Sequence, residues 1–350
     1  MKMVDLILWA ALLAAPEAAA RGACAADEHR YGTWETTAGG AGPCDRLAYV
    51  NASCGAPLTA DRLCRAVACR PALLVGDSLM FSLYEGLRNF VNTSGRLASE
   101  RPELSMHHRA PCPPVGTPRR GFSLACPDAC GASVSIDFER HDHLIDQAFC
   151  STKGYCCDGW HDPKLLSHYA TVVTTTGAHL VEFGKNALDV DLRIFFQKLA
   201  EDVAARLASF VTDKSLVFVK AHVGHAKTEL GRATRGVARA APPARIVVNE
   251  YRWELMPALG DAMARALSAK AGAAVVDPTL ALDLRSDCRL NALHFEPAVV
   301  ARSTGRMVVD ALLERQWARD APATGARRLA RTSNAINKYL TVTKKNHHDN

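Results

Sequence analysis

The chain has 350 residues, of which 48% are hydrophobic and 22% charged, a composition typical of a globular protein and unlike that of a disordered or collagen-like chain. A chain of this length can bury a large core in one sizeable domain or two smaller ones. The formal net charge of +6, from 42 basic against 36 acidic residues, is mild, and part of the excess lies in residues 321–350. Because no recognised nucleic-acid motif accompanies these charges, we interpret that segment as a basic flexible tail and expect no nucleic-acid partner.

The N-terminus resembles a secretory signal. An apolar stretch covers residues 6–15, and Ala18-Ala19-Ala20 supplies the small residues of a cleavage site. The stretch is shorter than the about 20 apolar residues that a membrane span requires, so we expect residues 1–20 to be a signal peptide, with an uncleaved signal anchor as the alternative. No other segment is apolar enough to span a bilayer. The expected location is the secretory pathway, either secreted or in the Golgi lumen.

Cysteine usage agrees with that route. The chain has 12 cysteines, and an even number in an oxidising lumen indicates disulfides, although the spacings leave their connectivity open. Cys126 and Cys130 have the interval of zinc ligands, but no second pair completes a tetrahedral site, so we expect disulfides there too. Two glycosylation acceptors, at Asn51 and Asn92, indicate a glycoprotein. We expect residues 21–69 to form a cysteine-rich extension that wraps the core.

Residues 70–320 alternate apolar strands with helical stretches, which predicts an α/β domain with a mostly parallel sheet covered on both faces. Apolar residues at helical spacing predict helices over 192–210 and 253–271. Residues 101–165 contain loops rich in cysteine and proline that we expect to overhang a cleft. The predicted strands are 72–75, 133–138, 171–175, 216–221, 245–249 and 273–276.

The sequence around Ser78 indicates a reactive serine. An apolar run ends in Gly76-Asp77-Ser78, and helical spacing begins at Leu79, which predicts a strand that delivers Ser78 to a helix N-terminus. We expect Gly76 to adopt the tight turn that this change of direction requires. Unpaired helix N–H groups and the helix dipole stabilise negative charge there, as an oxyanion would need. The alternative is that Asp77 and Ser78 merely cap the helix.

A nucleophilic serine needs a base, and His294 is the candidate. It lies on a loop between the predicted strand 273–276 and an amphipathic helix, and catalytic residues concentrate in such loops. His179 and His225 close apparent strands at the same expected edge, so each either lines the substrate cleft or is a satisfied boundary histidine. Other histidine clusters lack the spacing of a metal motif and are expected in solvated loops, without metal: His107-His108, His141-Asp142-His143 and His161-Asp162.

Several segments resemble, in the same order, the SGNH (GDSL) hydrolases in the variant found in PC-esterase and trichome-birefringence-like proteins. Residues 75–79 resemble the first block of that family, and residues 31–34 its Gly-x-Trp signature. Residues 172–179 are similar to its central strand ending in Asn-Thr-Gly-x-His, and residues 291–294 to its closing Asp-x-x-His. Weaker likenesses fall at 79–87, 218–225 and 251–253. Each motif alone is weak, but their shared order makes chance matches a poor explanation.

The resemblance implies an SGNH-like three-layer sandwich and serine chemistry on an ester, commonly an O-acetyl group of a polysaccharide or glycoconjugate. The family includes both esterases and acetyltransferases, and we expect no cofactor. Carried over by position, Ser78 is the nucleophile and His294 the base. The backbone N–H of Ser78 contributes to an oxyanion hole, with Gly76, Asp77 and Gly177 beside the cleft.

Two positions depart from the family pattern. Asn291 stands where the family has the aspartate of its closing block, and Thr175 stands where it has an asparagine. An amide orients an imidazole but does not stabilise the imidazolium, so Asp287 is the alternative carboxylate. The Thr175 hydroxyl can still donate toward an oxyanion. We therefore expect a serine O-acyl esterase or O-acyltransferase. The alternative is a weak or inactive carbohydrate-binding protein of this fold. A secreted lipase is a weaker hypothesis, because no Gly-x-Ser-x-Gly elbow is present.

Overall fold

The computed structural model describes residues 33–36, 44, 47–50, 57–101, 120–142, 144, 163–177, 181, 189–211, 214–222, 255–285, 288–290 and 293–320. The predicted signal peptide and basic tail lie outside these residues, as does most of the predicted extension, so the domain boundaries stay predictions. Within the described part, no helix has both the length and the apolar character needed to cross a membrane.

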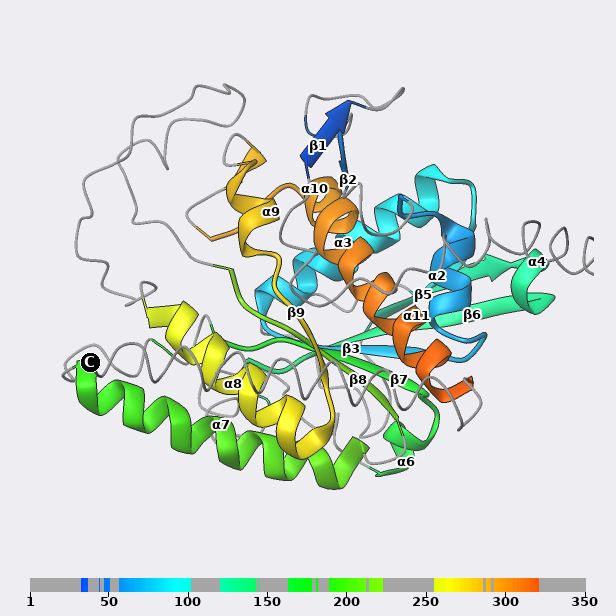
Figure 1. Cartoon of the computed structure of the whole chain (residues 1–350). Helices are drawn as coiled ribbons and strands as arrows, with labels where there is room; N and C mark the ends of the chain where they lie inside the picture. Colours follow the sequence, from blue (N-terminus) through cyan, green and yellow to red (C-terminus); the bar gives the residue numbers. More distant parts are fainter. Residues whose placement is uncertain are drawn as a thin grey trace, which may run out of the picture.

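A central sheet forms the middle layer of the molecule (Figure 1). Its strands follow one another in space as β4-β5-β6-β3-β7-β8-β9. The five strands from β6 to β9 run parallel, and β4 and β5 add an antiparallel edge. The α/β fold with a mostly parallel sheet is thus confirmed. The strand bounds are β3 Ala72–Gly76, β4 Leu97–Glu100, β5 Arg120–Cys126, β6 Ala132–Arg140, β7 Thr171–Thr174, β8 Ser215–Val219 and β9 Ala274–Val276.

Five of the six predicted strands are present with small shifts at their ends, and the sixth, 245–249, lies outside the described residues. Strands β4 and β5 are not predicted from the sequence pattern. Only one residue of β4 is even partly buried, and Arg120, Gly121 and Ser123 interrupt the apolar pattern of β5. The pairing of β5 with β6 and of β4 with β5, rather than a local pattern, makes these segments strands.

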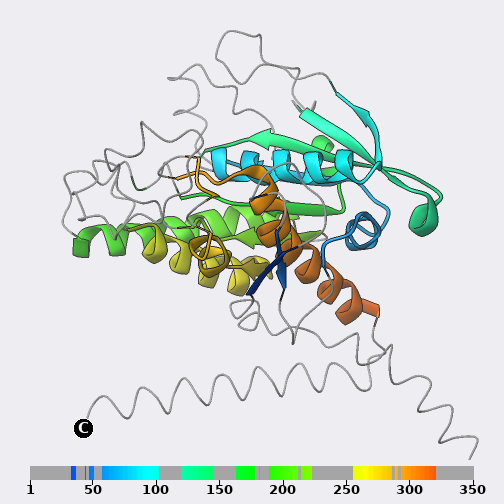
Figure 2. The same ribbon diagram turned by 90° about the horizontal axis from the view of Figure 1, so that it is seen from above.

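Helices cover both faces of the sheet (Figure 1). On one face lie α7 (Asp189–Val211) and α8 (Met256–Ala271), close to the predicted helices 192–210 and 253–271. The other face carries α3 (Ser78–Thr93) and a continuous helix made of α10 (Pro297–Val300), the π-helical turn η6 (Ala301–Gly305) and α11 (Arg306–Asp320). Seen from that side, α3 runs along the strands while the helix from α10 to α11 crosses them (Figure 2). Shorter helices are α2 Ala60–Ala66, α4 Pro127–Cys130, α6 Pro163–Ser167 and α9 Thr279–Asp283.

Two hydrophobic cores, one on each face, follow from the alternation of side chains along the strands. In β3, Leu73 and Val75 pack with residues of α7 and α8, whereas Ala72 and Leu74 pack with residues of α3 and α11. All five residues of β3 are buried. This continuous apolar run is what a central parallel strand requires, and it ends directly before Ser78.

Part of the cysteine-rich extension is described as a small hairpin of β1 (Thr33–Thr36) and β2 (Leu47–Val50). The indole N–H of Trp34 donates to the carbonyl of Ala281 in α9, at 2.9 Å. A disulfide joins Cys44 to Cys288, shortly before His294 in the chain. The described part of the extension is therefore fastened to the segment that carries the candidate base.

Two further disulfides hold the start of the domain against the antiparallel edge of the sheet. Cys64 in α2 pairs with Cys126 at the end of β5, and Cys69 pairs with Cys130 in α4. Cys126 and Cys130 are thus disulfide-bonded to different partners, as expected from their preference for disulfides over zinc. None of the cysteines in the described residues is free.

Removing the Cys44–Cys288 disulfide is expected to destabilise the fold. It closes a loop with a sequence separation of 244 residues, against 61 for Cys69–Cys130. We expect the double variant C44S/C288S to lose about 2–5 kcal/mol of unfolding free energy, and C69S/C130S about 1 kcal/mol less, because the shorter loop restricts the unfolded chain less. Urea unfolding of both variants and the unmodified protein, in the same buffer without reducing agent, measures these differences. An unfolding midpoint of C44S/C288S equal to that of the unmodified protein would contradict this expectation.

Candidate active site

The buried strand β3 places Ser78 at the first position of α3. Asp77 is the N-cap: its carboxylate accepts a hydrogen bond from the Leu79 N–H at 2.9 Å, and its side chain is fully buried. The capping role therefore belongs to Asp77, which leaves the hydroxyl of Ser78 for another contact. The capping interpretation is confirmed for Asp77, and the reactive role of Ser78 stays a prediction.

Gly76 is needed here for a reason other than the predicted turn. It is the last residue of β3 and is not among the glycines with positive φ. A Cβ at this position would lie 2.6 Å from the carbonyl oxygen of Thr175 and 2.9 Å from the Thr175 methyl carbon. The close approach of the β7 end, rather than a special backbone conformation, explains the glycine.

The structure brings Ser78 and His294 together across 216 positions of sequence. The Oγ of Ser78 lies 2.9 Å from the Nε2 of His294, within hydrogen-bonding distance. Both residues are only partly buried. Transfer of the serine proton to Nε2 requires that Nδ1 carry the ring hydrogen. The distance establishes that the pair is formed, whereas the roles of nucleophile and base remain predictions.

The position of Ser78 in the sheet is the place where α/β proteins bind ligands. From β3 the chain first reaches β6 on one side and later β7 on the other. Such a change of direction leaves a crevice at the carboxyl ends of the strands. The first N–H groups of α3 have no acceptor within the helix, and the positive end of its dipole faces the same crevice. A helix N-terminus favours negative charge, and one of its N–H groups, that of Leu79, is already bound to the Asp77 carboxylate.

Backbone contacts hold the segment that carries His294. Arg289 and Phe295 form an isolated antiparallel bridge, the Leu290 N–H donates to the carbonyl of His294, and the Glu296 N–H donates to the carbonyl of Cys288, both at 2.9 Å. Leu293 and Phe295 are buried, while His294 between them is partly exposed. Leu293 packs in the core on the α7 and α8 face and Phe295 in the core on the α3 and α11 face, so both neighbours of His294 are anchored in the interior.

Four of the predicted site residues lie outside the described residues: Asp287, Asn291, His179 and His225. The choice between Asp287 and Asn291 as the group that orients His294 therefore stays a prediction. Thr175 and Gly177 are described, and both are buried just after β7. Gly177 has a φ of +149°, a conformation that favours glycine.

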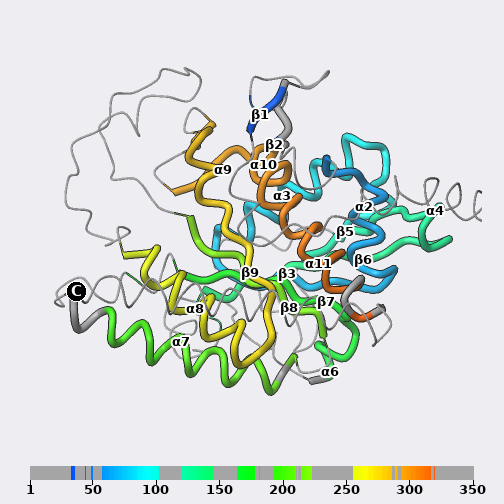
Figure 3. The backbone as a smooth tube through the Cα atoms, viewed as in Figure 1, coloured from blue at the N-terminus to red at the C-terminus, as the bar shows by residue number. Residues whose placement is uncertain are grey.

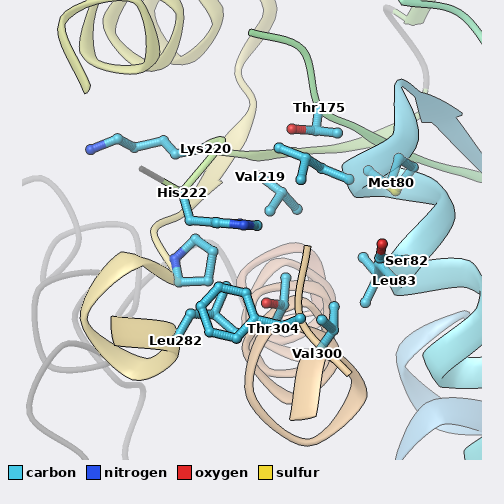
Figure 4. Close-up of a pocket in the computed structure, with 13 residues that line it drawn as sticks. Met80, Ser82, Leu83, Thr175, Val219, Lys220, His222, Leu282, Val300 and Thr304 are labelled. Atoms are coloured by element: carbon cyan, nitrogen blue, oxygen red, sulfur yellow. The ribbon is translucent and has the colours of Figure 1, made fainter. Parts of the chain in front are cut away.

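A small pocket lies at the same edge of the sheet, between α3, the carboxyl ends of β7 and β8, and the helix formed by α10 and η6 (Figure 4). It has room for about one water molecule. Most of its wall is apolar, and the polar side chains that line it are Ser82, Thr175, Lys220, His222 and Thr304. The Thr175 hydroxyl is buried and has no hydrogen-bond partner within the described part of the chain, so it remains free to donate to a bound group.

Lys220 at this edge is held as a cation. Its ammonium group contacts Asp277 at 2.6 Å and Asp261 at 2.7 Å. Burial on its own would lower the pKa of Lys220, but the hydrogen bonds that its ammonium donates to the two carboxylates outweigh this effect and raise the pKa. Burial would likewise raise the pKa of Asp277, yet the contacts with Lys220 and Thr279 lower it. Lys220 therefore stays protonated near neutral pH and does not compete with His294 as a base.

The expectation that His141 and Asp142 lie in a solvated loop is wrong. His141 is fully buried and Asp142 is 2% exposed, because both follow β6, the strand beside β3. The His141 N–H donates to the Gly76 carbonyl at 2.9 Å, and the Thr176 hydroxyl donates to the Asp142 carbonyl at 3.0 Å. The histidines at 107, 108, 143 and 161 lie outside the described residues. Within the described ranges, no group of three or more potential ligands is placed to hold a metal ion.

His222 is a further residue at this edge that the sequence pattern does not indicate. It follows β8 at the carboxyl edge of the sheet, three positions before the predicted cleft residue His225. The sequence does show that histidines follow the β8 strand. A strand pattern, however, does not determine whether His222 or His225 lies at the carboxyl edge of the sheet.

No protein-family model and no curated protein matches this sequence. One similar solved structure is LAE5, an alpha/beta hydrolase enzyme from the metagenome of Lake Arreo, Spain, with 13% identity, a TM-score of 0.38, and coverage of 70% of this chain and 95% of that one. A second crystal structure has 15% identity and a TM-score of 0.37, and covers 70% of this chain and 98% of its own. Likenesses at this level assign no function to this chain.

Proposed function

We propose that this protein is a serine-dependent O-acyl esterase or O-acyltransferase, with Ser78 as nucleophile and His294 as general base. The observation that carries the proposal is the 2.9 Å contact between the Ser78 hydroxyl and the His294 imidazole. The position of Ser78 at the N-terminus of α3 adds the N–H groups that an oxyanion requires. Serine and histidine in this relation form the reactive part of a catalytic triad.

The reaction proceeds in two halves. Ser78 Oγ attacks the carbonyl carbon of the ester while His294 Nε2 takes the hydroxyl proton. The carbonyl oxygen becomes an oxyanion beside the N-terminal N–H groups of α3. The ester C–O bond then breaks, and the imidazolium returns the proton to the leaving alcohol, which leaves the acyl group on Ser78. Water or a second hydroxyl attacks this acyl-enzyme with the same help from His294, and Ser78 is regenerated.

The proposed substrate is an acetylated polysaccharide or glycan, and this part rests on the resemblance to PC-esterase and trichome-birefringence-like proteins. The motifs of that resemblance surround Ser78 and His294, the two residues that meet in the fold. We place the protein in the secretory pathway, secreted or in the Golgi lumen. Three disulfides in the described residues agree with an oxidising compartment.

A second candidate function is carbohydrate binding without turnover. It is favoured by Asn291, which stands where the resembled family has an aspartate. An amide in that position orients the imidazole but does not stabilise the imidazolium, which lowers turnover without altering the fold.

A fluorophosphonate probe tests the proposal, because it forms a covalent adduct with an activated serine. We expect the purified chain to be labelled at Ser78 and to release acetate from an activated acetyl ester, and S78A to do neither. The control is S209A, which removes an exposed hydroxyl on α7. Labelling without acetate release would favour the carbohydrate-binding alternative. Equal acetate release by S78A and the unmodified protein would remove the serine mechanism.

A further inference from the structure

His222 lies directly behind the segment that carries His294. It follows β8 at the carboxyl edge of the sheet and is 6% exposed. Figure 4 shows its ring reaching toward the middle of the pocket, between Val219 and Thr304. The ring is therefore a fixed part of the interior wall rather than a group that meets solvent.

The ring of His222 binds the residue immediately before His294. Its Nε2 lies 2.5 Å from the carbonyl oxygen of Leu293. A carbonyl oxygen accepts hydrogen bonds and cannot donate one, so Nε2 of His222 carries a hydrogen. This contact fixes the carbonyl at one end of the peptide bond that leads into His294.

The same ring contacts the residue immediately after His294. The rings of His222 and Phe295 meet edge to face, with centroids 5.1 Å apart. Arg289 lies over the Phe295 ring, 4.3 Å from its centroid, and Asp283 pairs with Arg289 at 3.2 Å. Phe295 is thus held between His222 and Arg289, and it is 1% exposed.

We propose that His222 is a positioning residue that sets the place of the His294 imidazole relative to Ser78. This inference rests on the proposed esterase or acyltransferase function. His222 contacts both chain neighbours of His294, the Leu293 carbonyl and the Phe295 ring, and the imidazole between them meets Ser78 through Nε2. A displacement of about 1 Å between reacting groups can reduce a rate about 10²-fold. His222 contacts Leu293 and Phe295, so it acts through His294.

The matched variants are H222Q and H222M, whose side chains have similar length and shape. Glutamine keeps an N–H donor for the Leu293 carbonyl, and methionine does not. Both lose the ring contact with Phe295, so the difference between them isolates the hydrogen bond. H168Q, which replaces an exposed histidine, is the control for histidine substitution in general.

We expect H222M to lower kcat for an activated acetyl ester about tenfold or more relative to H222Q, with KM changed less than about threefold, because the substrate-binding surface is left in place. The rate of fluorophosphonate labelling is expected to fall in parallel with kcat. Melting temperatures are measured for each variant, and the kinetics are run well below the lowest of them.

Equal kcat values for H222Q and H222M would overturn the inference. A change in KM alone, with kcat of H222M equal to that of H222Q, would also overturn it. So would an H222M chain that fails to fold while H222Q folds, because His222 would then be a determinant of the fold. S78A separates the two proposals. If S78A keeps full activity, the serine mechanism and this inference both fail. If S78A is inactive and the two His222 variants are equal, only the inference fails.

Discussion

Replacement of His294 by glutamine is expected to reduce ester turnover by a factor of about 10³ or more, because the amide cannot accept and return the Ser78 proton. Glutamine has an N–H donor and a carbonyl acceptor and nearly fills the space of the imidazole, and His294 is only partly buried, so the fold should be kept. The loss should appear in kcat, because His294 acts on the transferred proton. The buried contacts of this segment are made by its chain neighbours Leu293 and Phe295 rather than by the imidazole.

The measurement compares kcat and KM of H294Q with those of the unmodified chain and of H168Q. H168Q is expected to behave as the unmodified protein, because His168 is exposed and lies just after α6. Circular dichroism and melting temperature report whether the folds are equivalent. Turnover by H294Q within about tenfold of the unmodified chain would show that another group takes the proton, and His294 would lose its role.

Substitution of Gly86 by alanine is expected to destabilise the domain and lower its activity, although the same change in an isolated helix stabilises by about 1 kcal/mol. A Cβ on Gly86 would lie 2.3 Å from the carbonyl oxygen of Pro297 and 3.1 Å from the backbone nitrogen of Ala301. Backbone atoms cannot rotate away as a side chain does, so α3 and α10 have to separate. Figure 3 shows these two segments lying against each other.

Such overpacking costs about 1–3 kcal/mol, and we expect G86A at the upper end of that range. Separation of the two helices also moves Ser78, at the start of α3, away from His294, which stands shortly before α10. We therefore expect kcat to fall about 10²-fold. Urea unfolding and ester kinetics measure the two effects, with N89A as the control because Asn89 is exposed on the same helix. A G86A protein more stable than the unmodified chain would contradict the close contact.

The sequence predicts much of the fold because local pattern and tertiary position agree in the central strands. The run before Ser78 is apolar on both faces, and only a strand buried between two layers of helices requires that. The edge strands β4 and β5 have no such signal, since their partners, not their own residues, determine their structure. Disulfide pairing is likewise a property of the folded chain: Cys126 and Cys130 share a motif yet bind different partners.

In the candidate site, the meeting of Ser78 and His294 is predicted from the sequence, whereas the contacts of His222 with the segment that carries His294 are not. Ser78 stands at a change of pattern that a sequence displays, and its meeting with His294 follows from strand order at one edge of the sheet. His222 supports His294 through a backbone carbonyl and an aromatic edge, contacts that depend on the fold and leave no periodic signal. His141 is misjudged for a similar reason. A histidine after a strand is solvated or buried according to which strand lies beside it, and here that strand is β3.

The long separation between Ser78 and His294 has a consequence for biosynthesis. The ribosome releases the serine-bearing half of the sheet well before it releases the histidine and the final helix that packs beside it. Until His294 is in place, the Ser78 hydroxyl of a growing chain has no imidazole beside it. Under the proposed mechanism, reactivity toward esters therefore arises only after the segment that carries His294 has folded, and a chain interrupted before that point is expected to be inert.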